Sequence, residues 1–137
     1  DRANEIRMLA AQIQSSQPAD GENLPPFLTP HTLDQLQNHV AGINVALSIQ
    51  EYLVDLATAT RKHPAVALGL SPRGLIIWQR MAQAWAFLQD RDFITPDDVQ
   101  HVAKPVLDLR LGSQSESNER TIDQILASVA IPKGASR

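Results

Sequence analysis

Residues 60–73 read TRKHPAVALGLSPR, and this stretch joins the end of one predicted helix to the start of the next. Pro64 ends the first helix, because the residue before a proline avoids the α-helical region. Ser71 and Pro72 begin the second helix. Serine is a favoured N-cap, and proline fits the first helical position, where no N–H donor is needed. The stretch therefore predicts two helices separated by a short loop.

Periodic apolar side chains predict further helices on both sides of this stretch. We expect them, in chain order, over residues 1–14, about 30–40, 48–61, 72–89, 96–102, from Pro105 toward 111, and around 122–129. The expected N-caps are Thr29, Ser48, Ser71 and Thr95. The helix over 72–89 is expected to bury one broad stripe, made of Leu75, Trp78, Met81, Ala82, Trp85 and Leu88. Residues 92–94 could make a brief extended pairing. The predicted fold class is all-α, a small helical bundle.

Composition supports this fold class and excludes several functions. Of the 137 residues, 43% are hydrophobic but only 4% are aromatic, which suits helices packed on helices. The net charge of −3 provides no field that would attract nucleic acid or an anionic membrane. The absence of cysteine excludes disulfides and thiolate zinc sites. Since no apolar run could span a bilayer and no signal peptide is evident, we expect a cytoplasmic protein without nucleic-acid or membrane partners.

The motifs of a self-contained enzyme are missing. The sequence holds no phosphate-binding loop, no acidic cluster for magnesium and no H-E-x-x-H motif. Its four histidines do not occur at ligand spacing. Ser71 lies in no nucleophile motif, and adjacent carboxylates such as Asp97 and Asp98 point about 100° apart on a helix. The first residue is Asp1 rather than methionine, so we expect the chain to be part of a longer protein.

Arg73 is the candidate binding residue. At the second position of its helix it lies beside backbone N–H groups that lack helical partners, and its guanidinium can bind two phosphate oxygens at once. A solvated surface arginine is the alternative. On a helical wheel Arg73, Ile76, Arg80 and Phe87 share the face opposite the tryptophans. This face is either a second contact surface or a side buried within the same domain.

The string over residues 60–73, followed by RDFITPDDV over residues 91–99, resembles the lid subdomain of MoxR-type AAA+ ATPases. The similarity runs from about residue 1 to residue 132. It implies that Arg73 is the sensor-2 arginine, which reaches the γ-phosphate of ATP, and that Ser71 and Pro72 support it. Arg61, Ile76, Arg80 and Phe87 then become candidates for contacts with the core domain or with a neighbouring subunit.

The resemblance also implies partners and a division of the chain. The lid would close over ATP with magnesium on an AAA+ core that this chain lacks, within a hexameric ring. No cofactor is expected to bind tightly to the fragment itself. The parent would act as a chaperone or in metalloenzyme maturation, beside a partner with a von Willebrand factor A domain. Residues 1–14 would lead out of the core, 15–30 form a flexible loop, 31–111 the lid bundle, and 112–137 a linker, final helix and tail. Asp90 departs from the family by replacing a glycine.

Two alternatives belong to other functional classes. One is a stand-alone helical interaction module without nucleotide dependence, which docks a partner helix on Ile76 and Phe87. The other is a helix-turn-helix nucleic-acid binder, which the acidic net charge and the lack of a basic stripe disfavour.

Overall fold

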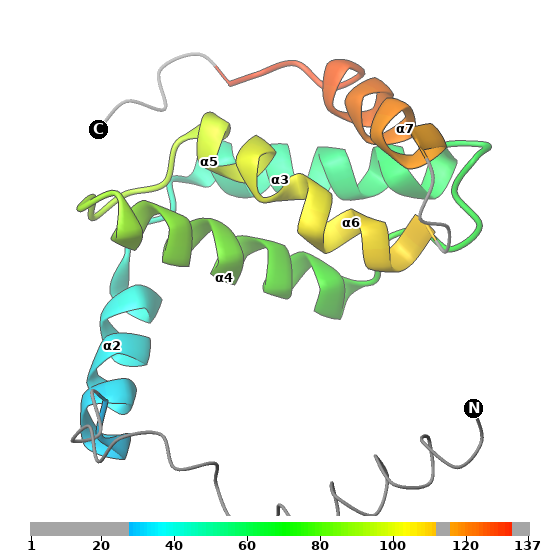
Figure 1. The fold of residues 1–137 in the computed structure, drawn as a ribbon. Helices are drawn as coiled ribbons and strands as arrows, with labels where there is room; N and C mark the ends of the chain where they lie inside the picture. The colour runs from blue at the N-terminus through cyan, green and yellow to red at the C-terminus, as the bar shows by residue number, and fades with distance from the viewer. Residues whose placement is uncertain (1–27, 112–115, 133–137) are drawn as a thin grey trace, which may run out of the picture. The chain divides into compact units, whose positions relative to one another are not determined.

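The computed structural model describes residues 28–111 and 116–132, with only the backbone at 109–111 and 116–117. The chain divides into two compact units, residues 1–33 and residues 34–137. The described part is helical, which confirms the predicted fold class (Figure 1). Its helices are α2 (Pro30–Gly42), α3 (Leu47–Lys62), α4 (Pro72–Leu88), α5 (Pro96–His101), α6 (Ala103–Leu111) and α7 (Glu116–Ala127). The helix predicted over residues 1–14 and most of the predicted loop at 15–30 lie outside the described residues.

Helices α3 to α7 pack around one core. In Figure 1, α3 runs behind α5 and α6, α4 lies along the lower side, and α7 covers the upper side, where it contacts α3 and α6. The core draws on every one of these helices, through Ile49, Leu53, Leu56, Trp78, Ala82, Val99, Leu107, Ile122 and Ile125. Because α7 contributes Ile122 and Ile125, the last helix is part of the bundle. It begins at Glu116, six residues before the range of 122–129 expected for the last helix.

Three of the four predicted N-caps are confirmed. Ser71 Oγ accepts a hydrogen bond from Gly74 N at 3.1 Å, and Thr29 Oγ1 accepts one from Thr32 N at 3.1 Å. Thr95 forms a capping box with Asp98. The fourth prediction, Ser48, is wrong. The α3 helix begins at Leu47 with Ala46 as its N-cap, which makes no side-chain cap bond. Tertiary contacts just before the helix determine this start.

Those contacts are a short extended pairing at the residues where one was expected. Asn44 and Phe93 form a parallel β-bridge, in which Asn44 N donates to Asp92 O at 2.8 Å and Ile94 N donates to Asn44 O at 3.2 Å. The bridge holds the chain extended immediately before Ala46. The turn between α4 and Phe93 contains Asp90 at φ 56°, so aspartate adopts the left-handed conformation at the position where the resemblance implies a glycine.

The buried face of α4 is narrower than predicted. Its buried residues are Gly74, Trp78, Ala82, Gln83 and Ala86, most of which lie on one row spaced by four residues. Of the predicted stripe, Leu75, Met81 and Trp85 are half-buried and Leu88 is 69% exposed. Leu88 is the last residue of α4 and lies beside the exposed turn, so no neighbouring helix covers it. The small residues of the row let α5 and α6 approach α4 closely.

A partly buried ion pair joins the turn after α4 to α5. The carboxylate of Asp98 accepts two hydrogen bonds from Arg91, Nη1 to Oδ2 at 2.6 Å and Nη2 to Oδ1 at 2.5 Å. It also accepts from Thr95 N at 2.7 Å as part of the capping box. Asp97 is exposed. The two adjacent carboxylates therefore do not share a site, as predicted, and only Asp98 binds Arg91.

Candidate functional site

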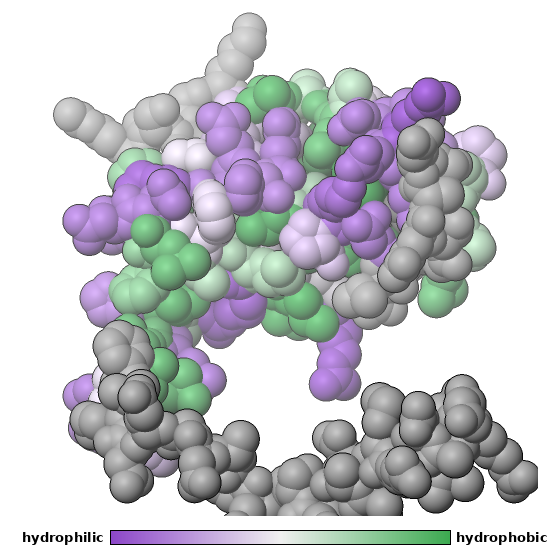
Figure 2. Space-filling view, viewed as in Figure 1, coloured by the Kyte–Doolittle hydropathy of each residue, from purple (hydrophilic) through white to green (hydrophobic). Residues whose placement is uncertain are grey.

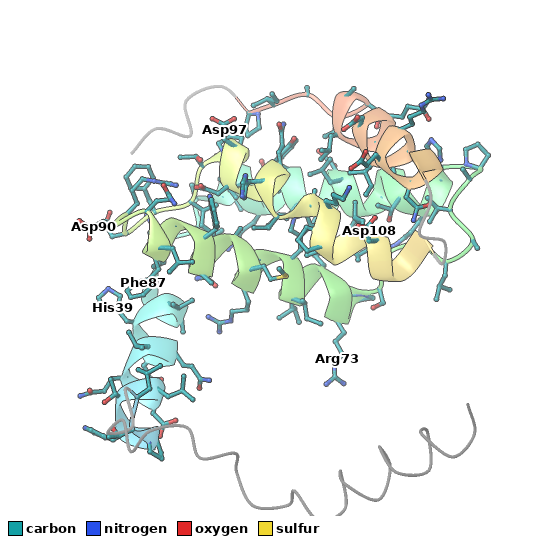
Figure 3. The ribbon with its side chains drawn as sticks, in the orientation of Figure 1. His39, Arg73, Phe87, Asp90, Asp97 and Asp108 are labelled. Carbon is teal, nitrogen blue, oxygen red and sulfur yellow. The ribbon has the colours of Figure 1, made fainter. Side chains whose placement is uncertain are left out.

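The Arg73 side chain projects from the first turn of α4 away from the helix bundle (Figure 3). It is exposed, and within the part of the chain that the structure describes no hydrogen bond or ion pair reaches its guanidinium. The first turn of α4 contains no acidic residue that could form an ion pair with the Arg73 guanidinium. Arg73 is thus placed where it can meet a ligand held by another body.

The backbone around Arg73 offers fewer donors than its helical position predicts. Pro72 has no N–H group, and the N–H of Gly74 already donates to Ser71 Oγ. The N–H of Leu75 donates to Ser71 O at 3.0 Å. Of the first four residues of α4, only Arg73 keeps an unpaired N–H. The prediction of several free donors is therefore wrong. Pro72 has no N–H group, and Ser71 accepts the hydrogen bonds of the next two N–H groups after Arg73. Anion recognition here depends mainly on the guanidinium.

The loop that leads into α4 is held by the end of α3. Thr60 Oγ1 donates to Ala57 O at 2.7 Å and accepts from Leu70 N at 3.0 Å. Arg61 Nε donates to Leu70 O at 2.8 Å. Both backbone groups of the buried Leu70 are therefore bound one residue before the cap of α4. Arg61, a candidate for contacts outside the chain, uses its Nε within the helical bundle. Thr60 was not singled out from the sequence.

Gly69 allows this loop to approach α3. A Cβ atom at position 69 would lie 2.6 Å from the Cα and 2.5 Å from the Cγ of Arg61, closer than carbon atoms can pack. We expect Gly69→Ala to lower the free energy of unfolding by about 1–3 kcal/mol, as overpacking against backbone does. Urea unfolding followed by circular dichroism measures the change.

Gly42→Ala is the matched control, since nothing lies within 4 Å of a Cβ at that position. Its stability should change by less than about 1 kcal/mol. Equal effects at the two glycines would show that the close approach at Gly69 is not important.

The remaining α4 candidates lie in different surroundings. Ile76 is 62% exposed, and its neighbour Ile77 is 45% exposed. Arg80 is also exposed, although its Nη1 donates to Gln83 Oε1 at 3.2 Å. Phe87 is half-buried, with its ring centroid 5.4 Å from that of His39 on α2. The face predicted from the helical wheel is therefore exposed at Arg73, Ile76 and Arg80, and is contacted by the chain's own α2 at Phe87.

Gln83 is a buried polar residue that was not predicted from the sequence. Its Nε2 donates to Ile43 O at 2.9 Å and to Ala41 O at 3.4 Å, so it ties the end of α2 to α4. Its position on the helical wheel, beside the buried row of α4, could have predicted that the side chain is buried. Its partners lie about 40 residues away in the chain and could not be inferred.

The histidines make separate local contacts. His101 stacks on Trp85 with centroids 3.9 Å apart, and His63 Nε2 lies 3.2 Å from Gln124 Oε1. Within residues 28–111 and 116–132, no three His, Cys, Asp or Glu side chains are grouped so as to hold a metal ion. No helix in the same ranges has the length and apolar content required to cross a membrane.

Comparisons with known proteins identify the family of this helical fold. A Bacillus subtilis (strain 168) protein named "Uncharacterized protein YeaC" is 36% identical over 117 residues, which cover 81% of this chain and 37% of that protein. The crystal structure of a "putative ATPase" from Cytophaga hutchinsonii superposes with a TM-score of 0.65 at 28% identity, covering 75% of this chain and 36% of that one. The chain thus spans little more than a third of either relative. The family model described as the AAA lid domain matches residues 58–129, more than half of the chain. The chain belongs to the AAA lid domain family.

Proposed function

We propose that this chain is the lid of a MoxR-type AAA+ ATPase and that Arg73 is its sensor-2 residue. The single observation that carries the proposal is the free guanidinium of Arg73 on a firmly held helix. Trp78 Nε1 donates to Val99 O at 2.9 Å, and Thr60 and Arg61 bind Leu70 just before the helix begins. Membership of the AAA lid family and likeness to a longer protein described as a "putative ATPase" support it.

The residues of this chain fit one part of an ATP site. Arg73 can bind the terminal phosphate, whereas the sequence has no phosphate-binding loop, so ATP and magnesium would be gripped by the core domain of the parent protein. ATP would supply the phosphoanhydride bond that is hydrolysed. Arg73 would contribute a charge-assisted contact of about 1.5–3 kcal/mol to the closed state. Loss of the terminal phosphate removes that contact and lets the lid swing, because a ligand shifts an equilibrium only by its differential affinity for the two states.

The wider role follows from the resemblance to the MoxR group. We propose a hexameric ring in which the lid contacts its own core and a neighbouring subunit, with Ile76 and Arg80 as contact residues. The motion of the lid would drive chaperone-like remodelling or metalloenzyme maturation, together with a partner that has a von Willebrand factor A domain.

Replacing Arg73 with alanine in the full-length parent protein tests the sensor role. We expect ATP turnover to fall at least about tenfold, because one phosphate contact of the closed state is lost. Arg120→Ala is the matched control: this arginine is exposed on α7, and its removal should leave turnover unchanged. Circular dichroism of both variants checks the fold. Unchanged turnover in a folded Arg73→Ala variant would refute the assignment.

A further inference from the structure

Thr60 carries a buried hydroxyl at the end of α3. The residue is 1% exposed and lies in the last turn of the helix. Its Oγ1 donates to Ala57 O at 2.7 Å and accepts from Leu70 N at 3.0 Å. A hydroxyl has one proton and two lone pairs, so it can do both at once. Because the bond to Ala57 O fixes the direction of the proton, a lone pair of Oγ1 is left for Leu70 N.

Leu70 connects this hydroxyl to the first turn of α4. Its carbonyl oxygen accepts from Arg61 Nε at 2.8 Å, and the residue is 1% exposed. The Leu70 side chain packs against Gly74, since a Cβ atom at position 74 would lie 2.7 Å from Leu70 Cδ1. The N–H of Gly74 also donates to the cap at Ser71. Leu70 and Ser71 therefore both contact the residue that directly follows Arg73.

The exposed side chain of Arg73 depends on this backbone for its position. Its guanidinium has no hydrogen bond or ion pair within residues 28–111 and 116–132. The neighbouring Ile76 and Ile77 are 62% and 45% exposed, and Figure 2 shows hydrophobic side chains along the lower edge of α4. Apolar neighbours cannot hold a guanidinium by hydrogen bonds. Since the next bond from α4 to another helix is at Trp78, the start of α4 is held chiefly through Leu70.

We propose that Thr60 is a positioning residue for Arg73. Through Leu70, its hydroxyl keeps the first turn of α4 formed and holds the guanidinium in one place before the nucleotide arrives. A group that is ordered in advance loses less conformational entropy when it binds, so more of the phosphate contact remains to favour the closed state. This inference rests on the proposed function and adds to it a residue that does not touch the nucleotide.

Two substitutions at position 60 separate the hydroxyl from the shape of the side chain. Thr60→Val keeps the branched shape and removes both hydrogen bonds, whereas Thr60→Ser keeps the hydroxyl. In the full-length parent protein, Thr60→Val should lower the maximal ATP turnover about threefold to tenfold, the effect of one lost hydrogen bond. Thr60→Ser should keep the native turnover. Thr58→Val is the matched control and should also keep it, because the Thr58 hydroxyl donates to Val54 O within the same helix.

An Arg73→Ala background distinguishes positioning from general destabilisation. Once the Arg73 side chain is removed, a residue that acts through it has nothing left to position. Thr60→Val should therefore cause no further fall in the turnover of Arg73→Ala. A general loss of stability would instead lower turnover by the same factor in both backgrounds, and that result would overturn the proposal. Circular dichroism at the assay temperature checks that each variant is folded.

Hydrogen–deuterium exchange of the parent without nucleotide follows the start of α4 directly. The amides of residues 68–75 should exchange about tenfold faster in Thr60→Val than in the native protein, because the first turn opens more often. Thr60→Ser and Thr58→Val should exchange as the native protein does.

Two further results would overturn the positioning role. One is unchanged exchange of residues 68–75 in Thr60→Val. The other is native turnover of Thr60→Val in a parent protein that Arg73→Ala impairs. Native turnover of Arg73→Ala itself would instead refute the sensor role, so the two failures are distinguishable.

Discussion

Asp98→Ala is expected to lower the free energy of unfolding by about 3 kcal/mol, near the lower end of the range for breaking a buried ion pair, because only the aspartate of this pair is fully buried. The side chain of Asp98 is 4% exposed, and its loss leaves Arg91 without the carboxylate that binds it at two nitrogens. The Arg91 side chain is 27% exposed, so water recovers part of the cost. The substitution also removes half of the capping box that starts α5. Urea unfolding followed by tryptophan fluorescence measures the loss.

Asp97→Ala is the control that separates the ion pair of Asp98 from the effect of a negative charge in the first turn of α5. Asp97 is the exposed neighbour in the same first turn and offers the helix dipole the same charge, so its removal should cost less than about 1 kcal/mol. Similar losses for the two aspartates would contradict the role assigned to the pair of Arg91 and Asp98.

The contribution of Asp98 should also depend on pH. Burial by itself raises the pKa of this carboxyl, but hydrogen bonds from Arg91 and Thr95 outweigh burial, so the pKa of Asp98 lies below the ordinary value of an aspartate. A carboxyl with a lowered pKa contributes stability that is present above the pKa of the unfolded chain and is lost as pH falls through the folded value. The stability difference between the native chain and Asp98→Ala should therefore be constant near neutral pH and shrink below about pH 4. A difference that is the same at pH 3 and pH 7 would exclude this linkage.

Trp78→Ala is expected to cost about 3–5 kcal/mol, the usual range for removing a large buried aromatic side chain. Trp78 is 0% exposed, and its Nε1 hydrogen bond to Val99 O joins the middle of α4 to α5. Alanine would leave a cavity and a buried carbonyl without this partner. Thermal and urea unfolding followed by circular dichroism measure the loss.

Trp85→Ala is the matched comparison. Trp85 lies two turns further along α4, where it is half-buried and stacks on the exposed ring of His101. Its replacement should cost less than half as much, because a partly exposed ring loses less on truncation. If both variants lost the same stability, Trp78 could not be the side chain that chiefly holds α4 in place.

The contacts of Trp78 with Val99, of Arg91 with Asp98 and of Leu70 with Thr60 hold α4 rigidly in the bundle. The helix that carries Arg73 is attached at its start through Leu70 and at its middle through Trp78, and the turn after it is attached through Arg91. A force on the Arg73 side chain is therefore transmitted to the whole bundle, because the start and the middle of α4 are both attached to it. Such rigidity is what a lid requires if one phosphate contact is to bias its position.

The sequence by itself determined the fold class and the starts of α4 and α5. Ser71-Pro72 and Thr95-Pro96 begin helices through interactions within one turn, which depend only on residues adjacent in the chain. The same local logic placed Arg73 at the second position of α4 and allowed a positive φ at Asp90. Belonging to the AAA lid family was likewise visible in the ordered motifs over residues 60–73 and 91–99.

Only the tertiary structure decided which of these side chains are free. The N-cap of α3 is Ala46 rather than Ser48, because Asn44, just before it, pairs with Phe93, almost 50 residues away. Phe87 is covered by α2, whereas Ile76 and Arg73 are open, although one helical wheel places all three on the same face. The bonds of Gln83 to the end of α2 also cross some 40 residues. A periodic pattern specifies which face of a helix is apolar, but which neighbour covers that face depends on contacts between distant parts of the chain.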